Sequence, residues 1–124
     1  MAEKGLFCGM NKPKDVAKMN DMEREHYPVI DCPDTIRPEE PFHVTIRIGE
    51  TPHAMEVGHH IQWLDIYFGQ NFNARIQFTP VFTRPEVTVT LIKGKKHGTS
   101  TLRVIGRCNV HGQWEATQEI TIAG

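Results

Sequence analysis

Apolar and polar residues alternate through much of the chain from residue 28 onward, and this pattern restricts the fold more than any other feature. It is clearest in residues 42–48, where Phe, Val and Ile occupy every second position. Successive side chains on an extended strand point to opposite faces, so the alternation predicts a strand with one buried face. Segments rich in Val, Ile, Thr and aromatic residues predict further strands at residues 61–68, 74–82, 86–92, 101–107 and 113–122.

Turn-forming residues separate these segments at intervals typical of antiparallel sheets. About seven short strands with such spacing predict an all-β fold, a seven-stranded antiparallel immunoglobulin-like β-sandwich. Residues 1–25 are polar with few apolar positions, so we expect an irregular N-terminal arm there. A chain of 124 residues can bury one sizeable core but not two. We therefore expect a single domain over residues 1–124.

Charge and hydropathy exclude several classes of function. The formal net charge is -1, so no overall basic field indicates a nucleic-acid partner. No apolar run approaches the roughly 20 residues that cross a membrane. The first ten residues have no apolar core after Lys4, unlike a secretory signal. We therefore expect a cytoplasmic protein with neither nucleic acid nor membrane as a partner.

Cysteine and histidine are the informative residue types. Cys8, Cys32 and Cys108 cannot all pair within one chain, and no Cys-x-x-Cys occurs. This disfavours a disulfide scaffold and the usual zinc-ribbon sites, and it leaves Cys8 and Cys32 without an assigned role. Seven histidines are unusual for this length. Those in segments expected to be loops are His26, His53, the pair His59–His60, and His111, which follows Cys108.

Cys108 and His111 form the most specific local pattern. Two residues between a thiolate and an imidazole let one turn present both to a single ion, although a buried cysteine and a surface histidine explain the pattern equally well. His59 and His60 are adjacent, so on an extended segment they point to opposite faces and only one joins a given site. Taken singly, His26 and His53 are also explained as ordinary polar loop residues.

Several imidazoles with one thiolate suit zinc, copper or iron rather than magnesium or calcium. Three histidines and one cysteine could make a closed tetrahedral zinc site. A His-Cys-His set on a sandwich is also similar to a blue-copper centre, but no methionine follows His111 within the next six residues. These alternatives stay open on residue types alone.

The spaced set as a whole resembles the superoxide reductase family in its one-iron form, neelaredoxin. The matching motifs are Glu-Arg-Glu-His-Tyr-Pro (23–28), Pro-His (52–53), His-His-Ile-Gln-Trp-Leu-Asp-Ile-Tyr (59–67) and Cys-Asn-Val-His-Gly-Gln-Trp (108–114). The similarity runs from about residue 23 to the C-terminus. Residues 1–20 do not contribute to it, and they lack the cysteine-rich module of two-iron relatives.

The resemblance implies one iron ion per chain, cycling between Fe²⁺ and Fe³⁺, which reduces superoxide to hydrogen peroxide. It also implies a rubredoxin-like electron donor and a homotetramer. A non-enzymatic copper or zinc sandwich for electron transfer or metal binding is the alternative. We expect backbone N–H groups of Val110 or His111 to tune the iron by bonding the sulfur. The implied ligands are four equatorial histidines and one axial cysteine, with His60 left out: His26, His53, His59, His111 and Cys108.

One motif departs from the family. The usual order before the first histidine is Glu-Lys-His, whereas this chain has Glu23, Arg24 and Glu25 before His26. By the resemblance, Glu23 is the sixth ligand of the ferric state and Arg24 takes the electrostatic role of the lysine. Arginine stays charged at any working pH and would be a poor proton donor. The alternative is Glu25 as the ferric ligand.

Overall fold

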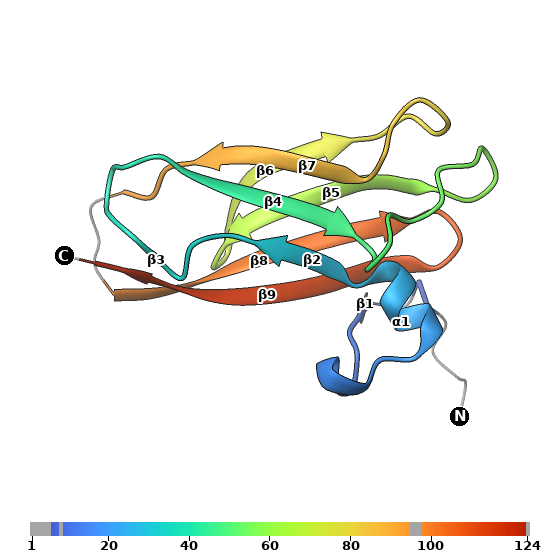
Figure 1. Cartoon of the computed structure of the whole chain (residues 1–124), viewed down its shortest axis with the longest axis horizontal. Coiled ribbons are helices and arrows are strands. Elements are labelled where there is room, and N and C mark those ends of the chain that lie inside the picture. The colour runs from blue at the N-terminus through green and yellow to red at the C-terminus, as the bar shows by residue number, and fades with distance from the viewer. Residues whose placement is uncertain (1–5, 8, 95–97, 124) are drawn as a thin grey trace.

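The computed structural model describes residues 6, 7, 9–94 and 98–123, which build two facing β-sheets (Figure 1). No helix in this described part is long and apolar enough to cross a membrane. Its elements in chain order are β1 (Met10–Asn11), the 3-10 helix η1 (Val16–Lys18), α1 (Asp21–His26), β2 (Pro28–Asp31), β3 (Thr35–Ile36), β4 (Phe42–Ile48), β5 (Ile61–Phe68), β6 (Asn71–Gln77), β7 (Glu86–Leu91), β8 (Gly98–Cys108) and β9 (Gly112–Ile122).

The larger sheet has the order β1-β9-β8-β5-β6, with β3 also on β9, and the smaller sheet has the order β2-β4-β7. All pairings are antiparallel except those of β1 and β3, which run parallel to β9. The predicted all-β antiparallel sandwich is confirmed. The seven strands of four or more residues match the expected number, and the two-residue strands β1 and β3 are additional. They cover the outer edge of β9 near its two ends, which limits edge-to-edge pairing there.

The core lies between the sheets and follows the period-two pattern. Val44, Ile46 and Ile48 of β4 are fully buried, as are Leu64 and Ile66 of β5 on the facing sheet. Burying one such side chain stabilises a fold by about 1.5–3 kcal/mol. These strands therefore provide a rigid frame for the loops that leave their ends.

The prediction of a strand at residues 74–82 is wrong about where the strand ends. β6 covers Asn71–Gln77, and residues 78–85 form a loop to β7. Pro80 has no N–H to give to a sheet ladder. Val81 has φ +73°, a left-handed conformation that no regular strand contains. The chain therefore leaves the sheet although its residue types favour a strand.

The N-terminal arm is more ordered than its polar composition indicates. Asn20 caps α1: its side chain accepts a hydrogen bond from the Glu23 N–H (2.8 Å), and the Glu23 carboxylate accepts one from the Asn20 N–H (2.9 Å). This reciprocal capping box satisfies two backbone donors. The helix ends at His26 because Tyr27, which precedes Pro28, is extended. The cap thus fixes where His26 emerges from the helix.

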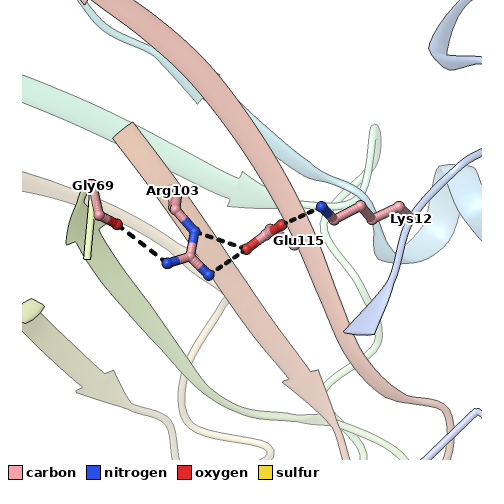
Figure 2. Close-up of polar contacts among 4 residues, drawn as sticks. All are labelled: Lys12, Gly69, Arg103 and Glu115. Carbon is pink, nitrogen blue, oxygen red and sulfur yellow. Dashed lines mark hydrogen bonds and ion pairs between the residues drawn. The ribbon is translucent and has the colours of Figure 1, made fainter. Parts of the chain in front are cut away.

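An ion cluster on the outer face of the larger sheet ties this arm to the sandwich (Figure 2). Glu115 of β9 is only 5% exposed. One of its oxygens lies 2.7 Å from Lys12 Nζ, and the other accepts hydrogen bonds from Arg103 Nε (3.0 Å) and Nη2 (2.8 Å). Arg103 also donates to the Gly69 carbonyl (3.2 Å). Burial alone would raise the pKa of Glu115, but the bonds from Lys12 and Arg103 outweigh it and lower this pKa.

We expect Glu115→Gln to lower the free energy of unfolding by about 1–3 kcal/mol, because it leaves Arg103 without its charged partner. Since folding lowers the pKa of Glu115, its contribution is present above the pKa of the unfolded carboxyl group and is lost as pH falls through the folded value. Urea unfolding between pH 3 and 7 should therefore show the variant and the parent converging at acid pH. Glu119→Gln, at an exposed position of β9, is the control. An equal loss in both variants would contradict the prediction.

Three loops and α1 gather at one end of the sandwich (Figure 1). They are the β4–β5 loop (residues 49–60), the β6–β7 loop (residues 78–85) and the β8–β9 turn (residues 109–111). The C-terminus lies at the opposite end. Side chains far apart in the sequence can therefore meet at this end.

Candidate metal centre

All five residues expected to bind metal meet at the loop end. His26 is the last residue of α1, His53 and His59 come from the β4–β5 loop, Cys108 ends β8, and His111 follows in the turn. One ligand atom from each of His26, His59, Cys108 and His111 lies within 4.8 Å of the others. His53 Nε2 joins them, 3.1 Å from His26 Nε2 and 3.7 Å from Cys108 Sγ.

The four imidazole rings form a square. Ring centroids of neighbours are separated by 4.7 Å (His26–His53), 4.6 Å (His53–His59), 5.0 Å (His59–His111) and 4.8 Å (His111–His26). The diagonal from His26 to His59 is longer, at 6.4 Å. Neighbouring rings are inclined to one another by 60–85°. This arrangement suits four equatorial nitrogen ligands around one ion.

Hydrogen bonds fix which nitrogen of two rings faces the centre. Nδ1 of His26 donates to the Met22 carbonyl (2.7 Å), and Nδ1 of His53 donates to the Ala54 carbonyl (2.7 Å). A carbonyl only accepts, so both Nδ1 atoms carry the proton and both Nε2 atoms carry lone pairs. Two lone pairs thus face one another at 3.1 Å with no proton between them. A shared cation satisfies both.

The spacing fits an ion quantitatively. Two nitrogens bound about 2.1 Å from one ion at right angles lie about 3.0 Å apart, close to the 3.1 Å between His26 Nε2 and His53 Nε2. Nε2 of His59 is buried and has no hydrogen-bond partner among the described residues. An unpaired buried nitrogen is costly. The residues therefore fit a metal ion at this position.

Cys108 lies beside the square and is fully buried. Its Sγ is 3.7 Å from His111 Nδ1 and accepts hydrogen bonds from the backbone N–H groups of Val110 and His111, as expected from the sequence. Burial raises the pKa of the Cys108 thiol, and these two bonds partly oppose the rise. A metal ion must therefore displace the thiol proton when it binds.

Burial holds His26, His53 and His111 in the neutral form that binds metals. Burial lowers the pKa of His26 to about 4. Burial also lowers the pKa values of His53 and His111, and the charge of the Glu25 carboxylate partly opposes both shifts. At neutral pH these imidazoles offer lone pairs without first losing a proton.

Two residues of the sequence motifs that are not among the predicted ligands support the cluster. Trp114 stacks on the His26 ring (5.1 Å between centroids, 21° between planes) and donates from Nε1 to the His111 carbonyl (3.0 Å). Asn109 accepts from the His60 N–H (2.8 Å) and donates to the Gly58 carbonyl (3.1 Å), which ties the turn to the β4–β5 loop. Their fixed spacing from Cys108 in the 108–114 motif is the sequence feature that could have identified them.

Other candidate residues lie outside the cluster. His60 Nδ1 contacts the Glu56 carbonyl at 3.1 Å. The Glu23 carboxylate is engaged in the cap of α1, and Arg24 is exposed on the same helix. Glu25 borders a cavity of about 400 Å³ that His53 and His59 also line. Cys32 is half-buried as a free thiol, and Cys8 lies outside the described residues.

The region that builds this cluster matches a known family. A family model described as desulfoferrodoxin matches residues 18–117, which include all five clustered residues. The chain belongs to the desulfoferrodoxin family. A protein of Methanocaldococcus jannaschii with a provisional superoxide reductase name is 38% identical over 117 residues, covering 94% of this chain and 97% of that protein.

Neelaredoxin of Megalodesulfovibrio gigas is 32% identical, with 79% of this chain and 88% of that protein covered. Among solved structures, the superoxide reductase (neelaredoxin) from Ignicoccus hospitalis superposes with a TM-score of 0.79 at 32% identity, covering 92% of this chain and 95% of that one. The Ignicoccus hospitalis structure shares the sandwich fold, and the match covers most of the length of each of these three proteins.

Proposed function

We propose that the chain is a superoxide reductase that holds one iron ion through His26, His53, His59, His111 and Cys108. The overall reaction consumes one superoxide, one electron and two protons and gives one hydrogen peroxide. The observation that carries the proposal is the square of four imidazoles beside one buried thiol. The names of the relatives agree with it.

The donor set favours iron over the alternative metals. Structural zinc sites are almost always four-coordinate and tetrahedral, whereas four imidazoles in a square and one thiol would offer five donors to one ion, which suits iron. Blue-copper sites use two histidines and a cysteine in a trigonal arrangement. When bound, iron would supply the one-electron step between its ferrous and ferric states.

The charge of the ligands and the access to the cluster both suit the binding of a small anion. Neutral imidazoles add no negative charge, so among these five ligands only the thiolate would reduce the ion's positive charge. The buried Trp114 ring covers one face of the His26 ring. The cavity of about 400 Å³ between Glu25 and the His53–His59 side leaves access from solvent.

We further propose Glu25 rather than Glu23 as the carboxylate that occupies the sixth position in the oxidised protein. Glu25 borders the access cavity, and its charge acts on His53 and His111. Glu23 is held by the helix cap. We expect Glu25→Ala to change the visible spectrum of the oxidised protein and to speed azide binding, because it frees the position. Glu23→Ala should lower stability by about 1 kcal/mol and leave the spectrum unchanged. The reverse pattern would assign the role to Glu23.

The function is tested on purified protein. We expect about one iron per chain, a visible sulfur-to-iron band that bleaches on reduction, and superoxide consumption that yields peroxide without oxygen. Oxygen release would indicate dismutation instead. A colourless zinc protein that does not consume superoxide, or a copper protein, would reject the proposal in favour of the non-enzymatic alternative.

The reaction also needs an external electron donor, for which we propose a rubredoxin-like protein. Exposed apolar side chains on the three loops at the metal end support docking there, because small apolar contacts suit transient complexes. They are Val57, Val81, Phe82 and Val110. The homotetramer and the cytoplasmic location stay parts of this proposal that rest on the sequence. Saturation of turnover by a purified rubredoxin, and its loss in Phe82→Ser, would test the docking surface.

A further inference from the structure

Two adjoining cavities, together called the groove below, lie between the metal cluster and an arginine that the sequence motifs do not include. The access cavity of about 400 Å³ and a second cavity of about 360 Å³ share Thr51, Pro52 and His53 as lining residues, so the two adjoin. Glu25 lines the first cavity and Arg84 the second. The groove therefore has an anionic end and a cationic end, with His53 between them.

Backbone hydrogen bonds fix the position of the Arg84 segment relative to His53. The Ile48 N–H donates to the carbonyl of Pro85, the residue after Arg84 (3.0 Å), and the Ile48 carbonyl accepts from the His53 N–H (2.9 Å). Arg84 and His53 are thus anchored to the same residue of β4. The Val81 N–H donates to the Met55 carbonyl (2.6 Å), which fixes the β6–β7 loop to the β4–β5 loop a second time.

The loop that carries Arg84 is held in an unfavourable conformation. Val81 has φ +73°, which is rare for a β-branched residue and costs on the order of 1–3 kcal/mol. Such strain persists only where surrounding contacts over-determine the backbone. The contacts with Met55 and Ile48 provide this here. The geometry of the loop is therefore set by its neighbours on the metal side.

The distribution of charge along the groove indicates that Arg84 attracts an anion. Superoxide is a small anion, and the Glu25 carboxylate at the other end of the groove repels it. Among the described residues, no carboxylate pairs with the Arg84 guanidinium, so its charge acts on the groove. Arg24 and Arg84 are both exposed, but Arg84 lines one of the two cavities and Arg24 lines neither.

We propose that Arg84 attracts superoxide into the groove and toward the metal beside His53, the electrostatic role that the sequence motif assigns to Arg24. This inference rests on the proposed function and deepens it. The role is one of steering. Arg84 raises the local concentration of the anion, and it is not a proton donor because its guanidinium stays charged.

The test compares Arg84→Gln with the parent in two measurements on the iron-loaded protein. The first is the second-order rate of superoxide consumption at low ionic strength and at an ionic strength where the Debye length is below about 10 Å. The second is the affinity of the oxidised protein for azide, followed by its visible spectrum, which does not depend on turnover. We expect the rate to fall about tenfold at low ionic strength and to converge with the parent at high ionic strength. Azide should bind several-fold more weakly, with the same salt dependence.

Three variants complete the design. Arg84→Lys keeps the charge and should retain most of the rate and of the azide affinity. Arg37→Gln makes the same charge change near β3, which Figure 1 places at the opposite end, and should leave both unchanged. Arg24→Gln tests the competing residue. Parent-like values in Arg84→Gln, or a larger loss in Arg24→Gln, would overturn the inference alone. A parent protein that consumes no superoxide would overturn the proposed function together with it.

Discussion

Cys108→Ser is expected to abolish superoxide reduction and the visible sulfur-to-iron band together. The loss should exceed the roughly 10- to 100-fold that changes to outer-shell groups cost at metal sites, because the variant removes the proposed axial ligand itself. A serine hydroxyl is a far poorer ligand than a thiolate, and it leaves the N–H groups of Val110 and His111 without their sulfur acceptor. Iron content, the visible spectrum and superoxide consumption measure the effect.

The matched control is Cys32→Ser. Cys32 is a half-buried free thiol that packs against the core, away from the cluster. The Cys32→Ser substitution makes the same chemical change as Cys108→Ser. It should leave the iron content, the visible spectrum and the rate of superoxide consumption at parental values. A Cys108→Ser protein that keeps its band and its activity would show that the sulfur is not a ligand.

Gly49→Ala is expected to cause a large loss of stability at the end of the sandwich that holds the metal cluster. Gly49 has φ +91°, and a Cβ there would lie 2.6 Å from the Thr51 carbonyl oxygen and 2.7 Å from that of Glu25. These contacts are with backbone and cannot be relieved by a side-chain rotation. Strain of this kind costs on the order of 1–3 kcal/mol before any clash. We therefore expect a loss of at least about 2 kcal/mol by urea unfolding.

The same substitution should weaken metal binding, since Gly49 lies where the loop that carries His53 meets the end of the helix that carries His26. Pushing these segments apart lengthens the distance between the two Nε2 atoms, now 3.1 Å. Competition with a chelator measures the affinity. Gly58→Ala, in the same loop with no atom within 4 Å of its added Cβ, should have little effect on either quantity. Equal behaviour of the two variants would contradict the argument from close approach.

The long strands were predictable because they bury one face, and burial leaves a period-two signature in the residues themselves. β1 and β3 were not, since two residues carry no period and their pairing with β9 depends on distant parts of the chain. The end of β6 was misplaced because Val81 and Phe82 favour strands by type, whereas Pro80 and contacts with the β4–β5 loop turn the chain away. The extent of the domain stays a prediction.

The five clustered residues were all predicted from the sequence, because their motifs resemble those of the superoxide reductase family. Residue types and spacing alone left zinc, copper and iron open. The role of the Glu23–Glu25 segment was harder to read. Asn20 three residues before Glu23 is a capping-box pattern that sequence alone could have revealed. Arg84 could not have been identified, because its approach to His53 depends on two loops meeting through Ile48.

The order of the ligands along the chain has a consequence for how the protein matures. His26 precedes nearly the whole sandwich, and His111 comes from the last turn before β9. A nascent chain therefore cannot present the full donor set until β8 has been made and its turn has closed. Metal insertion becomes a late event in biogenesis, and a ribosome-stalled fragment ending before residue 108 should emerge unable to retain iron.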